Sequence, residues 1–344
     1  MTILEIQDFI KSNASVRVRG GGTKPALSNA ANLEMHELSG MLEYDPSEYT
    51  FTALAGTRVS EIAQILAEHG QHLPFDPPFL TAGATLGGTV AAGLSGSGRQ
   101  RFGGVRDFVL AVQFIDGLGE LVRGGGKVVK NAAGFDLPKM HCGALGAFGV
   151  LTELTFKVFP APKAWATLQL ECDNQKTALE VMQKLAGSSF DLECLDVFGN
   201  SVMIRIGGVI DALETRLENI QKFVGLEGLI TRDDTEIWRD AREFLWVQPN
   251  AVLVKIPLTA SKIPALESRI SEHGRTRYIS SGNLAWLEWT DSLENLDLIL
   301  LELQLSGLVL RGNTARGLLG KQVGGVLLER VLNTFDVERK FHAT

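Results

Sequence analysis

The sequence lacks the marks of several large classes of protein. Its 344 residues include only three cysteines, Cys142, Cys172 and Cys194, and none forms a CxxC pair. This excludes a disulfide framework and favours a reducing compartment. The net charge is −7 and no basic run is longer than a pair, so we expect no nucleic-acid binding. The first residues show no basic segment followed by an apolar one, so no secretory signal is predicted and a cytoplasmic location is expected.

Metal sites and membrane spans are not indicated either. Among the six histidines only His69 and His72 lie close together, and no cluster of His, Cys, Asp or Glu has zinc-site spacing, so we expect no metal. Residues 79–98 carry no charge, but 11 of these 20 residues are Gly, Ser or Thr, so the segment lacks the hydrophobicity of a span. We predict a loop-rich part of a soluble domain.

Glycine is the residue that the sequence has in excess. Of 37 glycines, 23 lie in residues 1–150 and 14 in the remaining 194, whereas all five tryptophans lie between Trp165 and Trp289. The composition changes at residues 158–164, where Pro160 and Pro162 suggest a linker. We therefore predict two domains, residues 1–160 and residues 161–344.

Periodicity predicts the same class, α+β, for both halves. Thr2 and Glu5 have capping-box spacing, which predicts a helix over residues 3–11. Asp116-Gly117 separates two alternating runs and predicts a hairpin, as expected where strands pair without helical crossovers. No internal repeat is visible. The other expected strands are 16–19, 33–38, 49–55, 150–158, 165–172, 202–206, 251–257 and 284–289, and the other expected helices are 60–69 capped by Ser60, 175–186, 211–223, 235–244, 260–272 and 291–305.

Four glycine-dense segments of the first half are candidates for ligand binding. Residues 19–24, RGGGTK, follow a strand, and successive glycines let backbone N–H groups converge on a pyrophosphate. In residues 83–93 small side chains let a helix that begins near Thr85 bring its N-terminal amides against an anion or a flat ring. Residues 96–107 and 130–150 are the third and fourth segments. Together they predict one extended ligand that carries phosphate and is partly apolar.

Two familiar nucleotide motifs are excluded. Neither Gly126-Lys127 nor Gly320-Lys321 has the spacing and the Ser or Thr of a Walker loop. The segment from Gly117 lacks the third glycine of the dinucleotide fingerprint and precedes a strand, which disfavours a Rossmann nicotinamide site.

The ordered motifs resemble a known family, the FAD-binding domain of the vanillyl-alcohol-oxidase type, also called PCMH-type. The subunits that bind FAD in bacterial glycolate oxidases are the members to which the chain is most similar. The second half resembles them more loosely, through IWR at 237–239 and WLEW at 286–289. The motifs that carry the resemblance are RGGGTK at 19–24, AGTRVSEIAQIL at 55–66, LPFDPP at 73–78, GATLGGTVAAG at 83–93, VRDFVL at 105–110, KNAAGFDL at 130–137 and GVLTEL at 149–154.

The resemblance implies a two-part FAD-binding domain followed by an α+β cap domain for substrate or subunit interaction. Residues 20–24 and 83–88 would clamp the pyrophosphate, and Val150 would lie near the adenine. Thr23 stands where members that bind FAD covalently often have histidine, so we expect non-covalent FAD. The implied cofactor-binding residues are Arg19, Gly20, Gly21, Gly22, Thr23, Lys24, Pro78, Gly83, Ala84, Thr85, Gly87, Gly88, Gly93, Arg106, Asp107, Gly149 and Val150.

The implied function is that of an FAD-binding subunit of a glycolate or other 2-hydroxy-acid oxidase complex. Its partners would be a second, catalytic FAD-containing subunit and an iron-sulfur subunit. The chain would have no membrane span of its own. Peripheral attachment to the inner membrane through the complex stays open. Two alternatives also stay open. One is a free-standing FAD-dependent alcohol or D-2-hydroxy-acid dehydrogenase, and the other is a structural flavin-binding subunit without catalysis.

The chain departs from the stand-alone dehydrogenases of this family. Residues 151–341 hold one histidine, His273, where those enzymes carry a His-rich motif, and Phe135 replaces the tyrosine of GYDL. We therefore assign no catalytic residue, and Cys142 and His141 are interpreted as packing residues. The candidate substrate-binding cations of the second half are Arg239, Arg242, Lys255 and Arg311.

Overall fold

The computed structural model describes residues 1–126, 136–314, 316–322 and 324–341, which form two compact units. The described part of the first unit is residues 1–95, 104–126, 136–161 and 324–341; the rest belongs to the second unit. The chain passes from one to the other between Ala161 and Pro162, within the boundary region that the prolines suggest. Residues 96–103, however, lie in the second unit, although the predicted boundary places them in the first. Residues 324–341 lie in the first unit, although the same boundary places them in the second.

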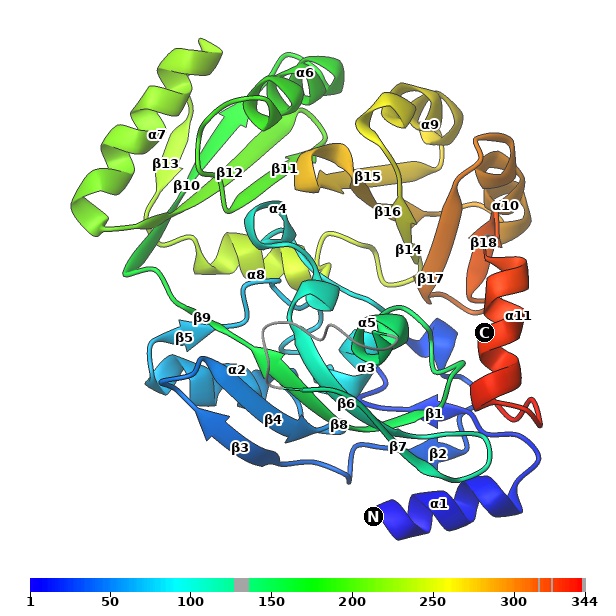
Figure 1. Ribbon diagram of the computed structural model, residues 1–344. Helices are drawn as coiled ribbons and strands as arrows, with labels where there is room; N and C mark the ends of the chain where they lie inside the picture. The colour runs from blue at the N-terminus through cyan, green and yellow to red at the C-terminus, as the bar shows by residue number, and fades with distance from the viewer. Residues whose placement is uncertain (127–135, 315, 323, 342–344) are drawn as a thin grey trace. The chain divides into compact units, whose positions relative to one another are not determined.

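A five-stranded antiparallel sheet is the centre of the first unit (Figure 1). The helices α2 (Val59–Glu68), α3 (Leu86–Ala91) and α5 (Leu137–His141) accompany it, and α3 packs against β4 and β8. On the sheet, the rings of Phe51 and Phe156 stack with their centroids 5.5 Å apart. The strand order is β3 (Met41–Asp45), β4 (Thr50–Leu54), β8 (Val150–Lys157), β6 (Val109–Ile115) and β7 (Leu121–Gly125).

A second, smaller core of the first unit joins segments that are far apart in the sequence. The helix α1 (Ile3–Ser12) begins with the predicted capping box of Thr2 and Glu5. It packs with the parallel pair β1 (Val18–Arg19) and β2 (Leu33–Glu34). Two further short strands, β5 (Gln71–His72) and β9 (Phe159–Pro160), pair with each other. The buried residues of this core are Ile6, Ile10, Val16, Leu33, Met35, Leu38, Ile115, Val150 and Phe341.

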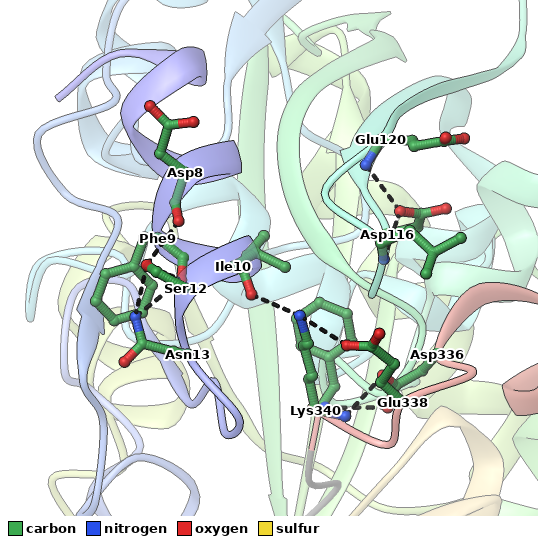
Figure 2. A network of polar contacts seen from close by, with 12 residues as sticks. Asp8, Phe9, Ile10, Ser12, Asn13, Asp116, Glu120, Asp336, Glu338 and Lys340 are labelled. Carbon is green, nitrogen blue, oxygen red and sulfur yellow. Dashed lines mark hydrogen bonds and ion pairs between the residues drawn. The ribbon is translucent and has the colours of Figure 1, made fainter.

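The last described segment completes that core. After the helix α11 (Gly325–Phe335), the buried carboxylate of Asp336 accepts hydrogen bonds from the backbone N–H groups of Lys340 and Phe341, at 2.8 and 3.0 Å. Lys340 Nζ donates to Ile10 O at 2.8 Å and also pairs with Glu338 (Figure 2). This placement explains why the segment lies with the first unit, although composition places it in the second.

A nine-stranded antiparallel sheet forms the second unit. The helices α6 (Gln175–Ala186), α7 (Ile210–Val224), α9 (Ile263–Ile270) and α10 (Leu293–Glu302) connect its strands, and α8 (Thr235–Glu243) packs through Trp238 against Cys194 and Met203. The strand order is β13 (Leu229–Thr231), β10 (Ala164–Glu171), β12 (Ser201–Gly208), β11 (Cys194–Phe198), β15 (Gly274–Ile279), β16 (Leu284–Trp289), β14 (Val252–Pro257), β17 (Ser306–Arg311) and β18 (Leu318–Gly320).

The topology of the second unit is duplicated, although no repeat is visible in the sequence. The series β10-α6-β11-β12-α7-β13 and β14-α9-β15-β16-α10-β17 have the same order of elements, and in both the strands lie in the order fourth, first, third, second. Each series is a ferredoxin-like unit. The pairing of β11 with β15 joins the strands of the two series into one sheet. The repeat is therefore one of topology, which is retained here without similar residues.

The α+β class is confirmed, and most long elements lie where periodicity predicts them. The helix expected at 60–69 is Val59–Glu68, but its N-cap is Arg58 and not Ser60. Among the elements that the sequence did not predict are β3, β11, β13, β15, β17 and α11. In the described residues no helix is long and apolar enough to cross a membrane.

Candidate cofactor site

Two adjoining hollows in the first unit, of about 570 and 490 Å³, make the candidate site. Their linings share Val18, Gly20, Gly88, Ala91 and Leu145, so they form one elongated depression. The smaller one is lined by residues 20–24 of the loop after β1, and the larger one extends to His141 and to residues 149–151 at the start of β8. That one extended ligand lies along this depression stays a prediction.

The loop of residues 20–24 supplies hydrogen-bond donors to the smaller hollow. A Cβ atom at Gly20 would overlap Thr85 Oγ1, and one at Gly21 would overlap the carbonyl oxygen of Gly83, so this loop lies directly on the segment that precedes α3. Within the described residues, the backbone N–H groups of 20–24 donate no hydrogen bond. Converging backbone donors without a protein partner are suited to an anion.

Lys24 adds a positive charge to the same end. Its Nζ lies 3.1 Å from Thr23 Oγ1 and 5.9 Å from the centroid of the Phe79 ring, and the side chain is half-buried. Burial lowers the pKa of Lys24 to about 8, so the ammonium group is still the main form at pH 7. An anion in this hollow would stabilise the charged lysine.

The helix α3 begins where the sequence predicts, with Thr85 as its N-cap, but its amides are used differently. Leu86 N donates to Thr57 O, Gly87 N to Ala55 O and Gly88 N to Thr85 Oγ1, at 2.9, 2.8 and 3.3 Å. The expectation that these amides bind an anion directly is therefore wrong, because they hold α3 against the loop after β4. Thr85, Gly87 and Gly88 still line the larger hollow.

The opposite end of the depression is apolar. Gly149, Val150 and Leu151 line it together with Leu145 and His141. Val150 and His141 are each 1% exposed, and Leu151 is 8% exposed. The sequence motifs predict that Gly149 and Val150 bind the ligand, whereas His141 is expected to be a packing residue. No sequence signal separated His141 from an ordinary core histidine.

Several predicted residues lie outside both linings. Arg19 pairs with Glu34 at 3.1 Å and donates to Ser28 O. Asp107 caps its own turn by accepting from Gly104 N at 2.8 Å. Six of the predicted residues do not line either hollow, and a seventh, Gly93, packs against Gly143. The six are Arg19, Pro78, Gly83, Ala84, Arg106 and Asp107. Residues 130–135 of the KNAAGFDL motif lie outside the described residues.

Buried charges of the second unit gather on one face of its sheet, where they anchor other segments. Arg205 makes two hydrogen bonds of 2.9 and 2.8 Å to Asp234, the residue before α8, and Asp234 also accepts from Thr167 Oγ1. Asp196 accepts from Arg277 Nε at 2.8 Å and from Ser97 Oγ at 2.6 Å, which attaches residues 96–103. These contacts give the charges a structural role.

The four candidate cations of the second unit differ in their surroundings. Arg239 pairs with Glu236 and Asp240 on the exposed side of α8. Burial, together with nearby Arg99, lowers the pKa of Lys255 to about 8. Burial also lowers the pKa of Arg311, and the side chain of Arg242 is half-buried. The described residues contain no group of three His, Cys, Asp or Glu that could hold a metal ion.

Comparisons with known proteins bear on the first unit above all. Residues 3–125 match the family model described as "FAD binding domain". The chain is 35% identical over 209 residues to glycolate oxidase subunit GlcE of Escherichia coli, covering 59% of each protein. It is 30% identical over 163 residues to a D-lactate dehydrogenase of Anaerostipes hadrus, covering 47% of this chain and 34% of that protein. The chain thus spans about three fifths or less of these relatives.

The fold is shared with a solved structure of low sequence similarity. Alkyldihydroxyacetonephosphate synthase superposes with a TM-score of 0.71 at 16% identity, over 98% of this chain and 73% of that one. At such identity the likeness is one of fold alone. The family match and the relatives together confirm the resemblance to an FAD-binding domain that the ordered glycine motifs indicate. Residues 3–125 of the chain are thus similar to an FAD binding domain, and this similarity implies FAD as the cofactor.

Proposed function

We propose that this chain is the FAD-carrying subunit of an enzyme complex that oxidises a 2-hydroxy acid, with glycolate, which would become glyoxylate, as the first candidate. The observation that carries the proposal is the 35% identity with glycolate oxidase subunit GlcE, in a chain whose first unit holds a depression at the predicted glycine loops. Further relatives are named glycolate oxidase subunit GlcD and D-lactate dehydrogenase, which supports hydroxy acids as the substrate class.

The residues of the depression fit FAD when the pyrophosphate lies at the loop of residues 20–24. The free N–H groups of that loop and the Lys24 ammonium would bind the phosphate oxygens. Thr85 and Gly88 would form the floor, because the absence of a side chain at Gly88 lets the ligand approach α3. The apolar end at Val150 would receive the adenine.

FAD would supply a flavin that takes up two electrons together and releases them singly, which suits transfer to an iron-sulfur partner. The residues of the first unit would bind and orient it. The second catalytic flavoprotein subunit and the iron-sulfur subunit are part of the proposal. GlcE and GlcD are named as subunits, which supports an assembly of several chains.

We further propose that FAD is held without a covalent bond. Thr23 cannot form the histidyl link, and burial raises the pKa of Cys142 to about 12, so this thiol is not available as a thiolate. Acid precipitation of the purified protein should leave yellow flavin in the supernatant. Flavin that stays with the precipitate would contradict this.

The complex and its substrate can be tested in one experiment. The tagged chain, isolated from its native cells under mild conditions, should bring down a second flavoprotein and an iron-sulfur protein, and this preparation should reduce an acceptor dye with glycolate or D-lactate. The chain produced alone should bind FAD but reduce the dye far more slowly. Full activity of the isolated monomer would refute the complex in favour of a free-standing dehydrogenase.

A further inference from the structure

The apolar end of the depression contains a polar side chain with a buried nitrogen that no hydrogen bond uses. His141, the last residue of α5, is 1% exposed, and its Nε2 has no hydrogen-bond partner among the described residues. Thr85 is the other residue with a polar side chain in the lining of this hollow, and its Oγ1 already accepts from Gly88 N. Buried polar atoms are nearly always paired, so His141 requires an explanation.

Packing alone does not provide that explanation. The His141 ring lies among aromatic rings, 4.2 Å from the centroid of Phe114 and 6.1 Å from that of Phe148. A phenylalanine would suit such surroundings without placing a nitrogen away from water. The backbone holds the residue firmly in place, because Gly143 N donates to Val90 O and Leu145 N to Ala91 O, both at the end of α3.

The protonation state of His141 is compatible with contact to a neutral ring. Burial lowers its pKa to about 4, so at pH 7 the imidazole is uncharged. A neutral imidazole has one nitrogen that donates and one that accepts, and tautomerisation exchanges their roles. It can therefore pair either with a ring nitrogen or with an amino group of a heterocycle.

The position of the hollow indicates which ring of FAD would lie there. The isoalloxazine carries the redox chemistry of FAD, whereas the adenine takes no part in it. Gly149, Val150 and Leu151 make this end of the hollow apolar, and all residues of its lining belong to the first unit. Such an apolar end suits the half of the cofactor that does no chemistry.

We infer that His141 forms a hydrogen bond to the adenine ring of FAD and so selects a flavin that carries adenine. The inference rests on the proposed placement of the pyrophosphate at residues 20–24. It adds a residue of this chain that neither the motifs nor the family model single out.

The test compares FAD binding by the full chain with that of three variants, after the flavin has been removed. His141→Phe keeps an aromatic ring among Phe114 and Phe148 but removes the nitrogen, and His141→Asn offers a shorter donor and acceptor. His69→Phe is the matched control, because His69 is exposed at the end of α2 and does not line the hollow. Calorimetry gives the FAD affinity, and displacement of FAD by ADP gives the affinity for a ligand with adenine and both phosphates but no flavin.

His141→Phe should weaken FAD and ADP by the same factor, about 3- to 10-fold, as expected for one hydrogen bond. Its thermal unfolding without ligand should occur at the same temperature or higher. His141→Asn should recover part of the affinity, and His69→Phe should change neither ligand. An FAD affinity within twofold of the unaltered chain, or a loss for FAD without one for ADP, would overturn the role of His141.

The control with the unaltered chain separates this inference from the proposed site. If ADP fails to displace FAD, the adenine does not lie in this hollow and the inference is overturned. If the unaltered chain takes up no FAD, the proposed cofactor site itself fails. If only His141→Phe is without effect, the site stands and the histidine has a packing role.

Discussion

The anchoring of the C-terminal segment by Asp336 gives a prediction with a calculable magnitude. Asp336 has no exposed surface, and its two carboxylate oxygens accept the backbone N–H groups of Lys340 and Phe341 (Figure 2). Gly117 N also donates to Phe335 O at 2.7 Å, so the segment is tied to the β6–β7 hairpin. Asp336→Ala would leave two buried donors without a partner.

The size of the effect follows from the number of lost contacts. A hydrogen bond to a charged group contributes about 1.5–3 kcal/mol, but removal of the carboxylate also relieves the cost of burying a charge. For two such bonds we expect a loss of about 3 kcal/mol in the free energy of unfolding of the first unit. For a unit of this size, that corresponds to a midpoint lower by about 6–12 °C. Glu338→Ala is the control, because that side chain is 57% exposed and should contribute less than about 1 kcal/mol.

The distribution of tryptophan permits the two units to be followed separately. All five tryptophans lie in the second unit, so their fluorescence reports that unit, whereas release of FAD reports the first. At a fixed FAD concentration, Asp336→Ala should lower the temperature of flavin release more than that of the tryptophan transition. The reasoning would be refuted if Asp336→Ala and Glu338→Ala had equal effects, or if the tryptophan transition alone moved.

Three further predictions concern the cofactor site. FAD affinity, measured by titration between pH 7 and 9.5, should fall above about pH 8 as Lys24 loses its proton. In Lys24→Met the affinity should be about tenfold weaker at pH 7 and nearly independent of pH. If the variant kept the pH dependence, Lys24 would be excluded as its cause. Cys142 should react slowly with iodoacetamide at pH 8 in the folded protein and rapidly in urea, as mass spectrometry can show, because burial raises its pKa to about 12; equal rates would contradict this. Gly88→Asp should keep the fold by circular dichroism but lose FAD, since its carboxylate would lie near Lys24 Nζ; unchanged binding would contradict the proposed pyrophosphate position.

The sequence predicted local structure well wherever a short-range signal decides it. The capping box of Thr2 and Glu5 begins α1, and Asp116-Gly117 forms the predicted turn, with Asp116 Oδ1 accepting from Leu118 N and Glu120 N. The glycine motifs were sufficient to identify the FAD-binding domain and its cofactor. In the capping box and the turn, neighbouring residues carry the whole interaction, so no knowledge of the tertiary structure is needed.

Contacts between distant segments could not be predicted in the same way. Lys340 bonds to Ile10 O across 330 residues, and a charged tail such as residues 336–340 gives no sign of burial. The two ferredoxin-like halves share their order of strands without a visible sequence repeat, because many different apolar residues satisfy one packing pattern. His141 was missed for a related reason, since its importance depends on a hollow formed by α3, α5 and β8.

The glycines of the first unit serve packing as well as binding, and this changes how they should be tested. A Cβ atom at Gly87 would lie 2.8 Å from Ala55 Cβ and 3.0 Å from Ala55 O, so a side chain there would move α3 away from β4 whether or not a ligand is present. At Gly88 the nearest atoms would be Thr85 Oγ1, at 3.0 Å, and Lys24 Nζ, at 3.7 Å, both at the depression. A substitution at Gly87 therefore tests the fold, whereas one at Gly88 tests the ligand. The glycine excess of the first unit is thus a sign of backbone segments packed on one another, and this packing brings the loop of residues 20–24, whose N–H groups have no partner among the described residues, against the segment that precedes α3.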